Sequence, residues 1–162
     1  MEPRRVFKPA RNRRLDPAVY TKLGQTCFFT IRAAGTLAPF ADPVRAQVVV
    51  DCLLGQQVKS GCRLDVYCVM PDHLHLLVTP VQEGASSLLY VDRFKGWCGR
   101  ELRLRGWKGP LWQPRSYDHL VRKEEDLQAL AAYILQNSVR KGMCAQPEDY
   151  SWGGIPGDHQ PS

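Results

Sequence analysis

The sequence predicts an α+β fold in which one mainly antiparallel sheet carries helices packed on one face. Strand-like and helix-like stretches follow one another in the order β-α-β-β-α-(β)-α, and no repeat or linker divides the chain. The chain has 162 residues, of which 44% are hydrophobic and 23% are charged, as in ordinary single globular domains. No run of about 18 apolar residues exists, and no apolar stretch follows Met1. We therefore expect a cytoplasmic protein without a membrane span or a secretory signal.

The first half of the chain predicts three strands and one helix. Residues 25–33 are rich in aromatic and β-branched side chains, which favours a strand. A helix over residues 43–54 begins with proline, which suits the first helical position. Residues 62–70 alternate in polarity, and the turn residues Pro71-Asp72 join them to a second alternating stretch over residues 73–79. These two strands are expected to form a hairpin.

The second half predicts two helices and one short strand. Residues 86–105 form a basic amphipathic pattern, and a loop and a short extended segment near 117–121 follow. Residues 124–139 show the clearest helical pattern, with acidic residues in the first turn and a glycine past the end. The predicted organisation is a basic arm over residues 1–23, a main domain over 24–145 and a poorly ordered tail, rich in Pro and Gly, over 146–162.

Basic residues gather in the arm and in the predicted helix over 86–105. The net charge is +6 and the sequence pI is about 9.1. Such clusters suit phosphate binding, although a solvated tail and a charged helix face would look the same. Trp107 and Trp112 could stack on unpaired bases or belong to the core. The candidate DNA-binding residues are Arg4, Arg5, Arg11, Arg13, Arg14, Arg93, Lys95 and Arg100.

Six cysteines are scattered along the chain without a CxxC pair. They lie mostly among apolar residues, so we expect reduced cysteines in the core rather than a zinc site or a disulfide framework.

His73 and His75 are the sharpest local feature of the sequence. Side chains two residues apart on a strand point to the same face, with Cβ atoms about 6.5–7 Å apart, so both imidazoles could bind one divalent cation. Leu74 and Leu76 would then face the core. The His-x-His pattern alone also occurs in strands that bind no metal.

Tyr133 and Asn137 form a second pair, on the last predicted helix. Residues four apart lie on one face, offset by roughly a quarter turn from the apolar stripe of that helix. The Tyr133 hydroxyl could thus be free to react, and the Asn137 amide oxygen could be a metal ligand. A packing tyrosine remains the alternative.

Three segments together resemble a known family. Residues 69–78 (VMPDHLHLLV) resemble the His-hydrophobe-His strand of single-tyrosine HUH transposases. Residues 111–122 (LWQPRSYDHLVR) and 133–137 (YILQN) resemble the C-terminal half of the REP-associated tyrosine transposases. The resemblance covers about residues 24–152, in the same order and with the same spacing.

The resemblance implies a ferredoxin-like HUH fold and a site that contains Mg²⁺ or Mn²⁺. His73, His75 and Asn137 take the metal-ligand positions, and Tyr133 takes the position of the nucleophile. The implied activity is a metal-dependent single-strand DNA endonuclease and strand transferase that works through a 5′-phosphotyrosine. Many relatives have proline where this chain has Ser138, so its last helix could run on.

Several alternatives stay open. Tyr117 is a rival nucleophile and His119 a rival ligand. A catalytically silent DNA-binding protein would use the same surfaces, and a metal-dependent enzyme that processes RNA or nucleotides would use the same fold. The expected partner is single-stranded or hairpin DNA, and the protein could be a monomer or a homodimer.

Overall fold

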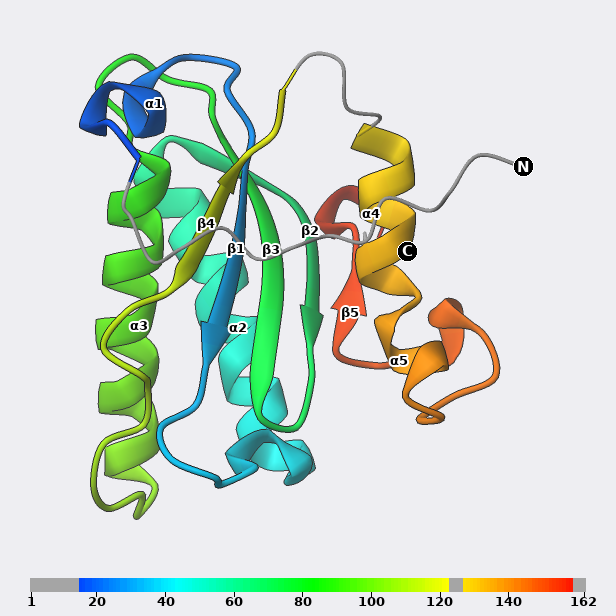
Figure 1. Ribbon diagram of the computed structural model, residues 1–162. Helices are drawn as coiled ribbons and strands as arrows, with labels where there is room; N and C mark the ends of the chain where they lie inside the picture. The colour runs from blue at the N-terminus through cyan, green and yellow to red at the C-terminus, as the bar shows by residue number, and fades with distance from the viewer. Residues whose placement is uncertain (1–14, 123–126, 159–162) are drawn as a thin grey trace.

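The computed structural model describes residues 15–122 and 127–158, which form a five-stranded sheet with helices on both faces (Figure 1). The strand order is β4-β1-β3-β2-β5, and every neighbouring pair is antiparallel. The strands are β1 (Cys27–Arg32), β2 (Cys62–Val69), β3 (His73–Pro80), β4 (Tyr117–Leu120) and β5 (Gly153–Gly154). The helices are α1 (Pro17–Thr21), α2 (Pro43–Ser60), α3 (Ser87–Leu104), α4 (Leu127–Leu135) and α5 (Asn137–Arg140), with short 3₁₀ turns at Pro39–Ala41, Pro147–Asp149 and Pro156–Asp158.

One face of the sheet packs against α2 and α3 and forms the larger core. Alternate residues of β3, such as Leu74 and Leu76, point into this core and are fully buried. The Tyr90 hydroxyl of α3 donates a hydrogen bond to the main-chain carbonyl of Leu53 in α2 at 2.6 Å, which joins the two helices. The predicted α+β class and antiparallel sheet are therefore confirmed, and these two helices share one face as expected.

The other face carries a smaller apolar cluster beneath α4. Ile134 of α4 packs with Phe28, Val66 and Leu77 of the sheet. In Figure 1, α4 lies on the side of the sheet away from α2 and α3. The sequence predicted helices on one face only, and the structure adds this second layer.

Two helix boundaries differ from the expected ones. α2 continues to Ser60 rather than ending near residue 54, because Gly55 lies inside the helix and the left-handed C-cap is Gly61, with φ of 69°. A Cβ atom at Gly55 would lie 2.6 Å from the Trp97 ring, so this glycine allows close packing of α2 on α3. The last helix is interrupted at Gln136, which separates α4 from α5.

The two terminal segments are more ordered than the sequence predicted, where they are described. Residues 17–21 form α1, capped by Asp16, instead of an irregular arm. The expected poor order of the tail is wrong for residues 147–158, because the Tyr150 hydroxyl donates to the Val69 carbonyl and β5 pairs with β2. The buried Tyr150 explains the difference, since it anchors a segment otherwise rich in Pro and Gly.

Two expectations from composition can be compared with the described residues. All six cysteines are free and five of them are buried, which confirms reduced core cysteines. Among the helices of residues 15–122 and 127–158, none has the length and apolar character needed to cross a lipid bilayer.

Candidate functional site

β3 places two histidines side by side on the sheet face away from α2 and α3. The ring centroids of His73 and His75 are 4.8 Å apart, and the ring planes meet at 74°. Leu74, between them in sequence, is buried in the opposite core. The alternation of the strand thus produces the common imidazole face that the sequence predicted.

The Nδ1 atom of each imidazole already has a partner. His73 Nδ1 lies 2.7 Å from the Asp72 carboxylate, and His75 Nδ1 lies 2.9 Å from the Thr30 hydroxyl. The Asp72 contact requires a proton on His73 Nδ1, since an ionised carboxylate only accepts hydrogen bonds. Neither Nε2 atom has a hydrogen-bond partner among the described residues. Partners at Nδ1 of this kind orient metal-binding histidines and leave Nε2 as the ligand atom.

Burial keeps His75 neutral. Burial is the largest cause that lowers the pKa of His75, and together with the charges of His73, Arg32 and Arg140 it brings the pKa to about 3. A neutral imidazole has a free lone pair, which is the form that binds a metal ion.

Tyr133 and Asn137 come from the end of α4 and the start of α5. The side chain of Tyr133 is 52% exposed, while that of Asn137 is 6% exposed. Asn137 Oδ1 accepts a long hydrogen bond of 3.4 Å from the Arg140 guanidinium. Asn137 Nδ2 is buried and has no hydrogen-bond partner in the described part of the chain. A buried amide with an unused donor is costly in free energy, so this side chain is not optimised for packing alone.

Arg140 connects the tyrosine with the asparagine. Its guanidinium carbon lies 4.1 Å from the centre of the Tyr133 ring, and one of its nitrogens donates to the Tyr133 carbonyl at 2.9 Å. It also contributes to the low pKa of His75, so its positive charge reaches the histidine pair.

A contact through Cys68 fixes the start of α5 over the sheet near His75. Cys68 of β2 lies directly opposite His75 of β3 in the strand register. Burial raises the pKa of the Cys68 thiol to about 12, and the main-chain N–H of Ser138 acts in the opposite direction because it donates to the sulfur. Asn137, the residue before Ser138, therefore lies near β2, the strand that neighbours β3.

The separation of the two histidine rings matches that expected for two imidazoles bound to one divalent cation. With metal–nitrogen distances of about 2.0–2.1 Å, two imidazoles bound at 90–109° would have ring centres about 4.5–5.2 Å apart, and the observed separation is 4.8 Å. Within residues 15–122 and 127–158, no three His, Cys, Asp or Glu side chains converge on a common point. A third protein ligand would have to be of another type, such as the Asn137 amide.

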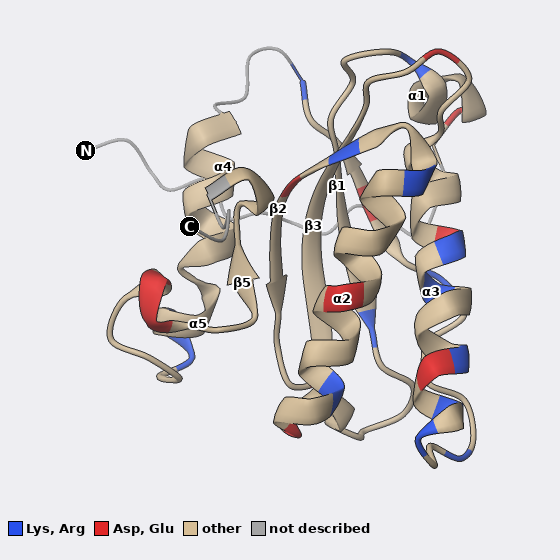
Figure 2. Cartoon of the chain, turned by 180° about the vertical axis from the view of Figure 1, so that it is seen from behind, with Lys and Arg blue, Asp and Glu red and all other residues tan. Residues whose placement is uncertain are grey.

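The basic residues predicted to bind DNA lie away from this face or outside the described residues. Arg93, Lys95 and Arg100 belong to α3, on the opposite side of the sheet, where Figure 2 shows several basic positions along the helix. Lys95 Nζ donates to the Gln113 carbonyl at 3.1 Å. The arm residues Arg4, Arg5, Arg11, Arg13 and Arg14 fall outside the described part of the chain.

The tryptophans favour the packing alternative. The Trp112 ring contacts Phe40 and Phe94, with centroids 5.3 and 5.7 Å away, and its Nε1 donates to the Lys95 carbonyl. Trp107 packs against the larger core beneath the Arg45 guanidinium. Both lie on the α3 side of the sheet.

Tyr117 and His119, the alternative nucleophile and the alternative ligand, lie on the same sheet face as His73 and His75, which we call the histidine face. Tyr117 of β4 pairs with Thr30 of β1, which pairs with His75, so the three residues form one row across the sheet. With strands about 4.8 Å apart, Tyr117 is two strand spacings from His75. His119 is opposite Phe28 and lies two residues beyond Tyr117 on β4. Tyr117 thus remains the alternative nucleophile.

Three residues of the site were not identified from the sequence. Arg140 follows Tyr133 by seven residues and Asn137 by three, a helical spacing that could have indicated it. Asp72 directly precedes His73 and could also have been found. Thr30 could not, because its contact with His75 depends on the register of β1 against β3.

Comparisons with known proteins agree with the sequence motifs. No protein-family model matches the chain. A candidate REP-associated tyrosine transposase of Haemophilus influenzae is 26% identical, over 54% of this chain and 56% of that protein. The REP-associated tyrosine transposase of Escherichia coli is 24% identical, over 78% of this chain and 74% of that protein. The chain thus matches little more than half the length of the first of these relatives.

Solved structures share the fold. The structure of a REP-associated tyrosine transposase bound to a REP hairpin matches with a TM-score of 0.71, covering 89% of this chain and 81% of that one at 21% identity. A crystal structure of a candidate transposase from Deinococcus radiodurans matches with a TM-score of 0.53, covering 72% of this chain and 92% of that one at 21% identity. The described residues therefore have the fold found in these proteins, as the sequence predicted.

Proposed function

Since the chain is a relative of the REP-associated tyrosine transposases, we propose that it is a DNA transposase that cuts and rejoins single strands able to form a hairpin. One observation carries this proposal. The rings of His73 and His75 share one sheet face, their Nε2 atoms have no hydrogen-bond partner among the described residues, and the buried Nδ2 of Asn137 has none either, which supports the proposal.

His73 and His75 would bind a divalent cation, Mg²⁺ or Mn²⁺, through their Nε2 atoms. Asn137 would add its Oδ1 as a third ligand, while Thr30 and Asp72 keep the two rings oriented. The bound ion would offset the charge that develops on the scissile phosphate. An amide and two imidazoles do not select the metal by themselves, since imidazole also suits Zn²⁺.

Tyr133 would be the nucleophile. Its phenolic oxygen forms a bond to phosphorus while the bond from phosphorus to the 3′ oxygen breaks, and that oxygen leaves as a 3′ hydroxyl after taking up a proton. The DNA then remains attached through a 5′-phosphotyrosine. Attack by another 3′ hydroxyl reverses these bonds, so rejoining requires no ATP.

Arg140 would support the attack in two ways. Its guanidinium lies against the Tyr133 ring, where it stabilises negative charge on the phenolic oxygen. It also donates a long hydrogen bond to Asn137 Oδ1, whose second lone pair stays available for a metal ion. The other N–H groups of the guanidinium could donate to a phosphate oxygen.

The proposal is tested by trapping the covalent intermediate. The full chain is incubated with a labelled library of single-stranded hairpins and Mg²⁺ or Mn²⁺, and the products are separated on denaturing gels. We expect a protein–DNA adduct that disappears in Tyr133→Phe and persists in Tyr117→Phe.

The other outcomes point to other functions. Binding without any adduct would favour a silent DNA-binding protein, and nucleotide products without an adduct would favour a nucleotide-processing enzyme. Loss of the adduct in Tyr117→Phe, with Tyr133→Phe unaffected, would transfer the nucleophile to β4.

A further inference from the structure

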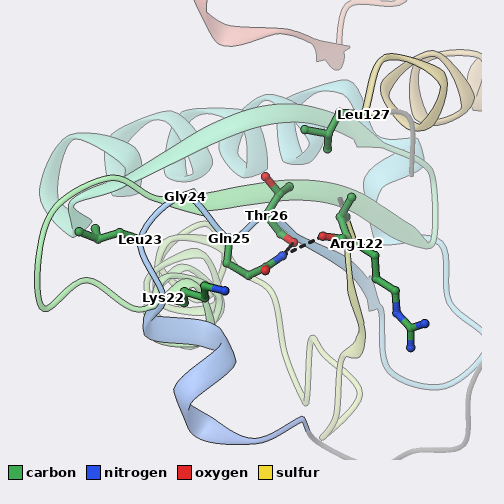
Figure 3. Close-up of a pocket in the computed structure, with 8 residues that line it drawn as sticks. Lys22, Leu23, Gly24, Gln25, Thr26, Arg122 and Leu127 are labelled. Atoms are coloured by element: carbon green, nitrogen blue, oxygen red, sulfur yellow. Dashed lines mark hydrogen bonds between the residues drawn. The ribbon is translucent and has the colours of Figure 1, made fainter. Parts of the chain in front are cut away.

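A concave site lies at the end of the sheet where the chain enters β1. It is a cavity of about 310 Å³ between the segment that enters β1, the end of β4 and the start of α4 (Figure 3). This volume is near the lower limit for small-ligand sites and suits a ligand the size of one nucleotide. Its lining residues are Lys22, Leu23, Gly24, Gln25, Thr26, Val121, Arg122 and Leu127.

The sheet connects this cavity with the histidine pair. Thr26 and Thr30 lie four residues apart on β1 and its extension, so their side chains point to the same face. The Thr26 hydroxyl lies 2.7 Å from that of Thr79, which precedes the end of β3, whereas Thr30 contacts His75. At about 3.3 Å per residue, Thr26 lies about 13 Å from Thr30 along β1, and Phe28 between them is buried beneath α4.

Gln25 presents a fixed hydrogen-bond acceptor at this cavity. Its Nε2 donates to the main-chain carbonyls of Thr26 at 3.0 Å and of Val121 at 2.8 Å. Two carbonyl partners require the NH₂ group at that position, so the orientation of the amide is determined by its contacts. Oε1 is left without a donor among the described residues. A paired base has its Watson–Crick N–H groups occupied, whereas an unpaired base can donate one to this oxygen.

The remaining walls suit the other parts of a nucleotide. Lys22 and Arg122 are exposed cations that lie on opposite sides of Gln25 in Figure 3, and both could contact phosphates. Leu23, Val121 and Leu127 add apolar surface for the face of a base. Cations, a fixed acceptor and apolar walls together match a nucleotide better than a free phosphate ion.

We propose that this cavity binds one unpaired nucleotide of the DNA strand whose cut end is held at Tyr133. The proposal rests on the proposed function, because it takes its ligand from the same strand. Even at the 3.4 Å spacing of stacked nucleotides, a strand attached at the histidine face reaches the cavity within about four nucleotides. The site would thus fix which nucleotide lies a set distance from the broken bond.

Binding of a short fluorescein-labelled single-stranded DNA, measured by fluorescence anisotropy, tests the proposal. The full chain carries Tyr133→Phe throughout, so that no cleavage interferes. We expect Lys22→Gln and Arg122→Gln each to weaken binding about tenfold. Each should also reduce the slope of log affinity against log salt concentration by about 0.7.

Matched controls separate this effect from a general loss of charge. Lys59→Gln removes an exposed cation from α2, on the other side of the sheet, and should change neither the affinity nor the slope. A series of oligonucleotides with a single abasic position should show one position, within four of the cut, where loss of the base weakens binding. The complementary duplex should show no such position.

The results can contradict nucleotide binding in the cavity and the proposed cutting chemistry independently of each other. If Lys22→Gln and Arg122→Gln bind like the parent, or if the chain does not bind the oligonucleotide, the cavity is not a nucleotide site. If both weaken binding while the protein with Tyr133 forms no adduct, the cavity stands and the proposed cutting chemistry fails. If Lys22→Gln and Arg122→Gln bind DNA with unchanged affinity and, with Tyr133 present, form the adduct normally, the cutting chemistry is supported and the nucleotide site is not.

Discussion

The two faces of the sheet differ in how completely helices cover them. α2 and α3, of 18 residues each, bury one face under the larger apolar core. On the other face α4 has nine residues and covers only part, which leaves His73 and His75 partly exposed beside a smaller cluster. Because alternate residues of β3 serve the two faces, one strand carries both the stability of the fold and its candidate chemistry.

Substitutions of neighbouring residues of β3 should have the largest and most different effects on the two faces. His75→Ala should lower adduct formation by at least about 100-fold, because it removes a ligand of the bound cation. Leu76→Ala should lower the free energy of unfolding by about 2–5 kcal/mol, because it leaves a cavity in the larger core. Gel assays of the adduct and urea unfolding measure the two effects. A large loss of stability in His75→Ala, or a specific loss of adduct in folded Leu76→Ala, would contradict the separation.

Thr30 contacts His75 without belonging to the proposed ligands. Thr30→Val keeps the shape but removes the hydroxyl bonded to His75 Nδ1. We expect the affinity for Mn²⁺ to fall about 10- to 100-fold, measured by isothermal titration calorimetry. Thr30→Ser should restore most of it. Equal affinities in Thr30→Val and the parent would show that the contact does not orient the imidazole.

Arg140 tests whether the uncovered part of this face depends on charge. Arg140→Gln removes the cation that lies against the Tyr133 ring and donates to Asn137. We expect the rate of adduct formation to fall about tenfold at saturating DNA, with partial recovery in Arg140→Lys, which keeps the charge but not the planar donor group. The rate is measured by rapid quenching. A variant that weakens DNA binding only, without slowing the chemical step, would exclude this role.

The smallest effects should be equal on the two faces. Tyr90 and Tyr150 each donate a buried hydrogen bond to a main-chain carbonyl, one on each side of the sheet. Tyr90→Phe and Tyr150→Phe should each lower the free energy of unfolding by about 1 kcal/mol. The thermal midpoint should fall by about 2–4 °C in both, measured by circular dichroism. If only Tyr90→Phe is destabilised, the smaller cluster does not contribute to global stability.

The sequence predicted best the elements whose pattern is local. The hairpin of β2 and β3 and the helix α3 lie within two residues of the expected positions, because alternation and amphipathic spacing are visible in the chain itself. The end of α2 was misplaced, since the glycine at residue 55 looks like a helix end but serves close packing against Trp97. That contact involves α3 and cannot be read from α2 alone.

Part of the candidate site could be predicted from residue types, but its supporting contacts could not. The His-x-His spacing on a strand predicted the shared face of the two imidazoles, while the roles of Tyr133 and Asn137 remain predictions. The break at Gln136 and the anchoring of Ser138 on Cys68 were not predictable, because both depend on how α5 packs against a distant strand. The order of the tail also depends on such a contact, between Tyr150 and Val69.

The short strand β5 has a further consequence for the behaviour of the protein in solution. It pairs with Tyr67 and Cys68 at the outer edge of the sheet, and the Trp152 carbonyl accepts the next main-chain N–H, from Val69. An apolar edge with open main-chain groups invites another polypeptide to add itself as an extra strand. By pairing with Tyr67 and Cys68, β5 covers this part of the edge of β2 and should reduce self-association through added strands.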